Sequence, residues 1–167
     1  IRHPPLQLGL QGGGNLGCRM QRQLQRGFAA GCQRVVLIGS DLPGLEPGDI
    51  EQAFADLQDS PLVLGPARDG GYWLIGLNRS GFERCGAALM SGIAWGSDQV
   101  LATTLERAEG LELPVALLPH TATRPCTLSA AMCVRPAARL CNKTARKGEV
   151  AKTSRRYKMS SLLRVPP

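Results

Sequence analysis

Two apolar runs that each end in a turn rich in Gly, Pro and Asp constrain the fold of this chain more than any other feature. The first reads Val-Val-Leu-Ile-Gly-Ser-Asp-Leu-Pro-Gly over 35–44, and the second reads Leu-Val-Leu-Gly-Pro-Ala-Arg-Asp-Gly-Gly-Tyr-Trp-Leu-Ile-Gly-Leu over 62–77. Apolar runs without alternation are typical of strands that are covered on both faces. Because open α/β sheets bind ligands beyond the carboxyl ends of their strands, the turns after these runs are candidate ligand-binding loops.

The rest of the pattern predicts helices between strands. Asn15 is expected to cap one helix, Pro47 to begin a second, and Ser97 to cap a third that runs to about Glu109. The first helix carries an apolar stripe of Leu16, Met20, Leu24 and Phe28. Strands are expected over 34–39, 61–65, 72–77 and 113–118, and a short helix over 82–89 within the ambiguous stretch 78–96. This order favours an α/β fold.

The charge of the chain divides at about residue 119. Residues 1–119 contain nine Arg, no Lys and twelve acidic residues, which gives a net charge of −3, whereas 120–167 contain eleven Lys and Arg and one acid, which gives +10. The sequence therefore predicts a domain over 1–119 and a disordered basic tail over 120–167. A basic tail can bind nucleic acid, but no aromatic residues alternate with its charges, so that function is the weaker alternative.

The location of the protein is predicted from what the sequence lacks. No apolar run is long enough to span a membrane, and the sequence shows no signal peptide. The six cysteines form no Cys-x-x-Cys pair, so a zinc site is not expected. We expect a cytoplasmic protein with reduced thiols.

Four of the loops carry candidates for chemistry, and each candidate has a plainer explanation. Asp41 follows a buried strand and is suited to hold a divalent cation, or it organises the turn through its own backbone. Asp69-Gly-Gly-Tyr72 lets backbone N–H groups approach a ligand, or it is a tight hairpin. The Gly-rich segment 12–17 can cradle a phosphate at a helix N-terminus, or it is a flexible loop. Trp95 stacks on a ligand or packs half-buried.

Four strings taken together resemble a bacterial family of GT-A-like transferases. They cover 11–20, 36–45, 64–77 and 93–101 and occur in the same order as in that family, so the resemblance extends over about 7–119. The family was long a domain of unknown function, and members are described as glycosyltransferases, some linked to arsenosugar biosynthesis. The resemblance implies a three-layer αβα fold of the nucleotide-diphospho-sugar transferase type, with a mostly parallel sheet.

The resemblance also implies a function and a site. A nucleotide-sugar would donate a glycosyl group to a small-molecule acceptor, with Mg²⁺ or Mn²⁺ at Asp41. Related nucleotidyltransferases make activation of a small phosphorylated molecule the alternative reaction. Asp69 and Asp98 are the expected catalytic residues. The expected substrate-binding residues are Gly70, Gly71, Tyr72, Trp95 and Ser97.

The chain departs from the family pattern at both ends. The family begins with a strand and a basic loop that grips the nucleotide, and the sequence lacks this segment, so we expect a partial or inactive copy. Cys18 stands where the family usually has Glu, and Trp73 where it usually has a second Tyr. Residues 120–167 lose the family pattern, gain Lys and Cys, and are interpreted as a translated frameshift.

Overall fold

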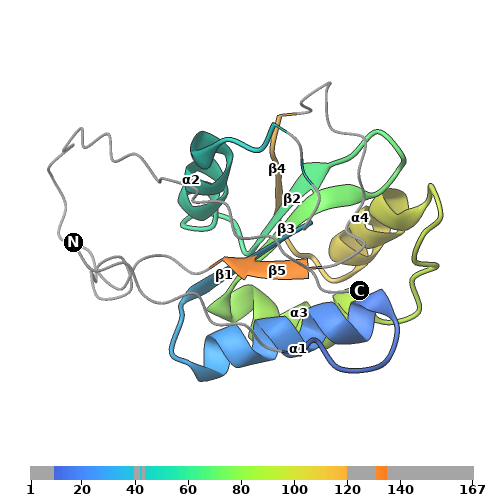
Figure 1. Cartoon of the computed structure of the whole chain (residues 1–167), viewed down its shortest axis with the longest axis horizontal. Coiled ribbons are helices and arrows are strands. Elements are labelled where there is room, and N and C mark those ends of the chain that lie inside the picture. Colours follow the sequence, from blue (N-terminus) through green and yellow to red (C-terminus); the bar gives the residue numbers. More distant parts are fainter. Residues whose placement is uncertain (1–9, 40–41, 43, 120–130, 135–167) are drawn as a thin grey trace, which may run out of the picture.

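The computed structural model describes residues 10–39, 42, 44–119 and 131–134 of the chain (Figure 1). Four helices and five strands are found in these residues. In chain order they are α1 (Leu16–Ala29), β1 (Arg34–Gly39), α2 (Pro47–Asp56), β2 (Leu62–Pro66), β3 (Tyr72–Asn78), α3 (Arg79–Met90), α4 (Val100–Gly110), β4 (Val115–Leu117) and β5 (Ala131–Val134). The predicted α/β class is confirmed.

The strands form one sheet in the order β4-β2-β3-β1-β5. β1, β2 and β4 run in one direction, and β3 and β5 run in the other. We expected a mostly parallel sheet. Three of the five described strands do share one direction, but most neighbouring strands pair antiparallel, and β2–β4 is the parallel pair among the described residues. The expectation is therefore corrected to a mixed sheet. The cause is the short hairpin after β2, which can only return antiparallel and which inserts β3 between β1 and β2.

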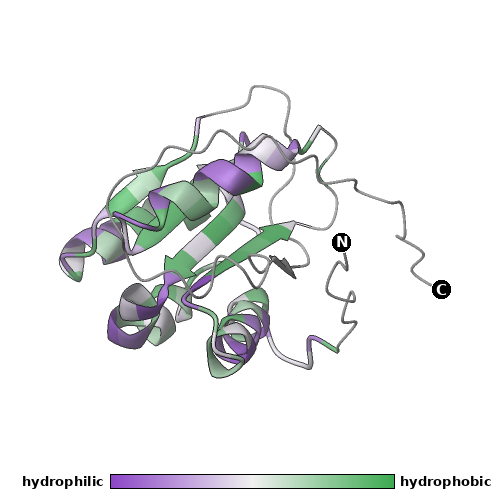
Figure 2. Cartoon of the chain, turned by 90° about the vertical axis from the view of Figure 1, so that its left-hand side faces the viewer, coloured by the Kyte–Doolittle hydropathy of each residue, from purple (hydrophilic) through white to green (hydrophobic). Residues whose placement is uncertain are grey.

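Helices cover both faces of the sheet, as the predicted three-layer arrangement requires. α1, α3 and α4 pack on one face, where Met20, Leu24, Leu37, Leu64 and Leu89 are fully buried. α2 packs on the other face with a smaller apolar cluster. Figure 2 shows the strands in the green of apolar residues, with hydrophilic residues gathered on the helices. The sheet thus lies between two layers that shield it from water.

The first two helices begin where the sequence predicts. Asn15 accepts a hydrogen bond from the backbone N–H of Cys18 at 3.0 Å, which satisfies one of the unpaired N–H groups at the start of α1. Gly31 has a φ of 88° and follows the end of this helix, as expected of a terminating glycine. Pro47 is the first residue of α2, and the backbone N–H of Glu46 donates to the Asp49 carboxylate at 2.9 Å.

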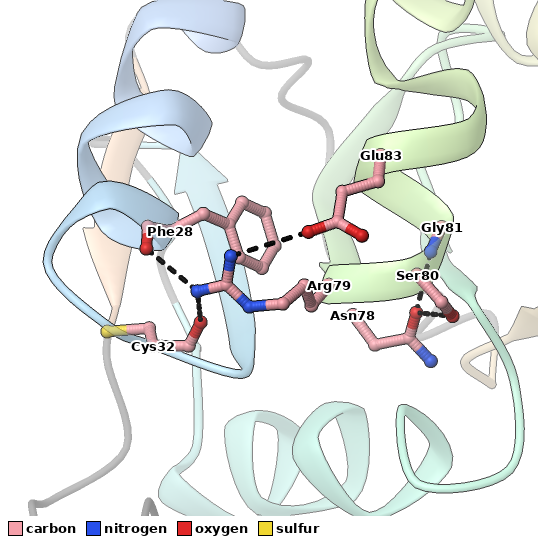
Figure 3. Close-up of polar contacts among 7 residues, drawn as sticks. All are labelled: Phe28, Cys32, Asn78, Arg79, Ser80, Gly81 and Glu83. Carbon is pink, nitrogen blue, oxygen red and sulfur yellow. Dashed lines mark hydrogen bonds and ion pairs between the residues drawn. The ribbon is translucent and has the colours of Figure 1, made fainter.

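α3 is longer than the predicted helix over 82–89 because a polar network fixes its start (Figure 3). The Asn78 side chain accepts from the N–H of Gly81 and from the Ser80 hydroxyl, both at 2.9 Å. The Arg79 guanidinium then reaches back to the end of α1, where it donates to the carbonyls of Phe28 at 2.8 Å and Cys32 at 3.1 Å. Arg79 thereby closes the C-terminal end of α1 as a basic cap.

A bulge in β3 sends Trp73 to the α2 face of the sheet. The pairing of β2 with β3 skips Trp73, since Gly65 lies opposite Leu74 and Pro66 lies opposite Tyr72. A Cβ at Gly65 would approach within 2.6 Å of the Trp73 ring. The indole therefore lies directly on the backbone of β2, a position that only a glycine permits.

The predicted tail contains one strand in the part that the structure describes. β5 pairs antiparallel with β1, with Gly39 opposite Ala131 and Val36 opposite Val134. The predictions of a disordered tail and of a frameshift otherwise concern residues outside the described ones. No helix in the described ranges is long and apolar enough to cross a membrane.

Candidate functional site

The predicted site residues that the structure describes gather at one end of the sheet. β1 ends at Gly39, β2 ends at Pro66 and β3 begins at Tyr72, and the strand register places these three residues together. β4 ends at the same edge, because Leu117 pairs with Leu64. Gly39 and Pro66, after which the two turns begin, therefore lie on either side of the start of β3 at this edge.

The loop between β2 and β3 is a tight hairpin. The N–H of Ala67 donates to the carbonyl of Gly71 at 3.0 Å, and the Asp69 carboxylate accepts from the N–H of Gly71 at 3.2 Å. Gly70 has a φ of 80°, which disfavours any residue with a side chain. The plainer explanation of Asp69-Gly-Gly as a turn is therefore confirmed, and it leaves the carboxylate of Asp69 at an exposed rim.

Gly70 joins this hairpin to the loop before α4. A Cβ on Gly70 would collide with the backbone of Asp98, and the carbonyl of Gly70 accepts from the N–H of Leu101 at 2.8 Å. The hairpin and the loop before α4 are thus in direct contact, although 28 positions separate Gly70 and Asp98 in the sequence. A glycine is required at position 70 because its backbone lies directly against the backbone of Asp98.

Two aromatic residues lie beneath these loops. Tyr72 is 1% exposed, and its ring meets the edge of Trp95 with ring centroids 6.5 Å apart at 89°. Burial raises the pKa of Tyr72 above its ordinary value of about 10, and the Thr104 hydroxyl offsets part of this effect. The Tyr72 hydroxyl has no partner at ordinary hydrogen-bond geometry in the described residues. Tyr72 therefore supports the site from below, while half-buried Trp95 borders it.

Ser97 and Asp98 shape the approach to α4. The Ser97 hydroxyl accepts from the N–H of Gln99 at 3.3 Å, and the Gln99 side chain donates to the Asp98 carboxylate at 3.2 Å. The helix itself begins at Val100, so the prediction that Ser97 caps it is corrected: Ser97 closes the turn before the helix. The Asp98 carboxylate is exposed beside Gly70.

Asp41, the predicted metal ligand, lies outside the described residues. No group of three His, Cys, Asp or Glu side chains gathers within 10–39, 42, 44–119 and 131–134. Asp69 and Asp98 offer the hard oxygen donors that Mg²⁺ prefers, and both belong to the loops at this edge. The chemistry of these two donors suits a divalent cation shared with a bound ligand.

Sequence reasoning missed the contact between the site and α1. A Cβ at Gly17 would collide with the carbonyl of Met90 and lie 2.8 Å from the Trp95 indole nitrogen. The N-terminal turn of α1 therefore packs on the end of α3 and on Trp95 in the loop before α4. A glycine at the second position of a helix indicates a close contact, but the neighbouring residues in the sequence do not identify the partner of Gly17.

A hollow of about 540 Å³ between the ends of α3 and α4 contains none of the predicted residues. Arg107 lines it and donates to the carbonyls of Ala88 and Gly92, each at 3.1 Å. These bonds tie two helix ends together, which is a structural role. The edge of the sheet remains the candidate functional site.

Comparison with known proteins gives a family and a fold. A bacterial family described as an uncharacterized protein conserved in bacteria, DUF2064, matches residues 2–97. A crystal structure from Desulfovibrio desulfuricans G20, of a proposed nucleotide-diphospho-sugar transferase, is 40% identical over 66% of this chain, with a TM-score of 0.62. The chain spans 46% of the length of that protein. Among proteins with curated descriptions, none matches.

Proposed function

Because this chain belongs to the DUF2064 family, we propose that it forms part of a nucleotide-diphospho-sugar transferase that moves a glycosyl group to a small acceptor. The contact between Gly70 and Asp98 is the observation that carries the proposal, because it unites both predicted loops at the carboxyl ends of β1, β2 and β4. The fold shared with the Desulfovibrio protein supports it.

In the proposed reaction, the acceptor oxygen bonds to the anomeric carbon as the bond from that carbon to the diphosphate breaks. The carboxylates of Asp69 and Asp98 lie at the rim, where they can accept hydrogen bonds from sugar and acceptor hydroxyls, and one of them takes the acceptor proton. Trp95 offers an apolar face beside them. Asp41 would hold a divalent cation, whose positive charge would stabilise the leaving diphosphate.

The first test measures binding, because the chain spans less than half of the Desulfovibrio protein. Calorimetry with a panel of nucleotide-sugars and Mg²⁺ is expected to find one donor that binds the wild-type protein. Asp41→Ala and Asp98→Asn should weaken this binding by about tenfold or more, as expected for loss of a charged contact. Asp59→Asn is the matched control, since Asp59 is exposed near the opposite end of β2.

Turnover of the bound donor then separates the two reactions. Release of a nucleoside diphosphate identifies glycosyl transfer, and release of pyrophosphate identifies nucleotidyl transfer. Asp98→Asn should lower kcat by about 10²-fold or more if this carboxylate accepts the proton. If no member of the panel binds, or if all three variants bind equally, the proposed function is wrong.

A further inference from the structure

The small net charge of the domain conceals a separation of charge. Residues 1–40 contain five Arg and no acidic residue, and the first acid in the chain is Asp41. Residues 41–119 contain all twelve acids of the domain and four Arg. The helix α1 and the loop before it therefore form a basic region against an otherwise acidic domain.

Three arginines of α1 hold the loop before the helix. Arg19 donates to the carbonyl of Gly14 at 3.0 Å, Arg22 donates to the carbonyl of Gly13, and Arg26 donates to the carbonyl of Leu10 at 2.8 Å. None of the three forms an ion pair with a described residue. A carbonyl carries no net charge, so no acidic side chain among the described residues compensates the three guanidinium charges. Each guanidinium also has five N–H donors and uses one or two of them.

This region borders the candidate site. The guanidinium groups of Arg19 and Arg22 lie against Gly13 and Gly14, and at most about 11 Å of chain separates Gly14 from Gly17. Gly17 in turn packs on Trp95. Figure 1 shows the loop before α1 on the same side of the molecule as the start of α4.

The start of α1 also has hydrogen-bond donors that no described residue accepts from. The N–H of Cys18 is bound by Asn15, and that of Arg19 by the carbonyl of Asn15. The N–H groups of Leu16 and Gly17 form no hydrogen bond with any described residue. Such donors at the positive end of a helix are suited to an anion.

We propose that Arg19, Arg22 and the first turn of α1 bind a phosphate group of the ligand that occupies the candidate site. The choice of phosphate as the anion rests on the proposed function, because a nucleotide-sugar carries a diphosphate. Guanidinium groups and helix N–H groups both donate hydrogen bonds to phosphate oxygens in many proteins. The phosphate belongs either to the diphosphate of the donor or to a phosphorylated acceptor.

The test measures binding of inorganic phosphate to the full chain at constant ionic strength. Nitrogen-15 spectra of the arginine side chains should show shifts at Arg19 and Arg22 on addition of phosphate and none at Arg84, which is exposed on α3. The double variant Arg19→Gln/Arg22→Gln should weaken phosphate binding by about tenfold or more. Arg84→Gln removes the same charge elsewhere and should leave binding unchanged. The spectra require no variant, so they decide the matter even if the double variant unfolds.

Two further ligands identify the source of the phosphate. A nucleoside diphosphate without metal represents the donor, and glycerol 3-phosphate represents a phosphorylated acceptor. If binding of either ligand depends on Arg19 and Arg22, the result supports the phosphate site and identifies which ligand supplies the phosphate. If phosphate causes no nitrogen-15 shifts at Arg19 and Arg22, or if Arg84→Gln weakens phosphate binding as much as the double variant does, the proposed phosphate site is wrong. Phosphate binding without binding of any nucleotide-sugar would refute the proposed function alone.

Discussion

The two ends of α1 are both bordered by arginine, yet the arginines have different partners. At the C-terminal end, Arg79 binds two carbonyls, lies 5.5 Å from the centre of the Phe28 ring and pairs with Glu83 at 3.5 Å. At the N-terminal end, Arg19 and Arg22 bind carbonyls and no carboxylate among the described residues. The first arrangement is complete within the protein, whereas the second leaves charge and donors for a ligand.

An arginine side chain can therefore contribute to stability or to binding, depending on which groups compensate its charge. Arg79 belongs to α3 and connects this helix to α1, so its loss should weaken the packing between the two helices. Arg22 comes from the helix it serves and holds a loop at the surface. Three measurements test the roles of these residues and of the packing around them.

The largest expected effect is that of Arg79→Ala. Loss of two charge-assisted hydrogen bonds to partly buried carbonyls should lower the free energy of unfolding by about 2–3 kcal/mol. Urea denaturation measures this change. Arg22→Ala should cost less than about 1 kcal/mol, because its carbonyl partners can bind water instead. Glu83→Gln is the control for the exposed ion pair and should cost less than about 0.5 kcal/mol. Equal costs for Arg79→Ala and Arg22→Ala would contradict the comparison.

The second prediction concerns the N-terminal end of α1. Gly17→Ala places a methyl group against the Met90 carbonyl and the Trp95 indole, so it should destabilise the fold by about 1–3 kcal/mol and change the fluorescence of Trp95. Gly48→Ala in α2 is the matched control, since nothing lies within 4 Å of its Cβ. That control should be neutral or stabilising by up to about 1 kcal/mol. A neutral Gly17→Ala would show that the two elements are not in close contact.

The third prediction is a pH dependence. Burial raises the pKa of Tyr72 in the folded state, so above about pH 10 the unfolded chain loses a proton that the folded chain retains. The contribution of Tyr72 to the free energy of unfolding is fully present below about pH 10 and falls as the pH rises. Between about pH 10 and pH 11 the loss should approach 1 kcal/mol in the wild type. Tyr72→Phe should reduce this dependence in urea denaturation, and an identical pH profile would show that the hydroxyl is not buried.

Features set by neighbouring residues were predictable from the sequence. The helix start at Asn15, the strand over 34–39 and the turn at Asp69 depend on side chains a few positions away. The position of β3 was not predictable in this way, because its pairing with β1 joins residues about forty positions apart. The start of α3 was missed because Gly81 and Gly86 weaken the helical pattern. Close contacts with Pro61 and Phe82 explain why glycine stands at these positions.

For the candidate site, the sequence identified the loops but not their contacts. The glycines at 70 and 71 were recognised as a turn, yet the role of Gly70 depends on the backbone of Asp98. The apolar stripe of α1 was recognised, yet the carbonyl partners of its arginines depend on how the Gly-rich loop folds back. Asp41 remains a prediction.

The bulge at Trp73 has a consequence for the evolution of this chain. With the indole lying on the backbone of β2, any side chain at position 65 would overlap the ring. The two positions therefore cannot change independently: position 65 becomes open to substitution only after position 73 has accepted a smaller residue. Descendants of this sequence should carry a larger residue at 65 only together with a smaller one at 73.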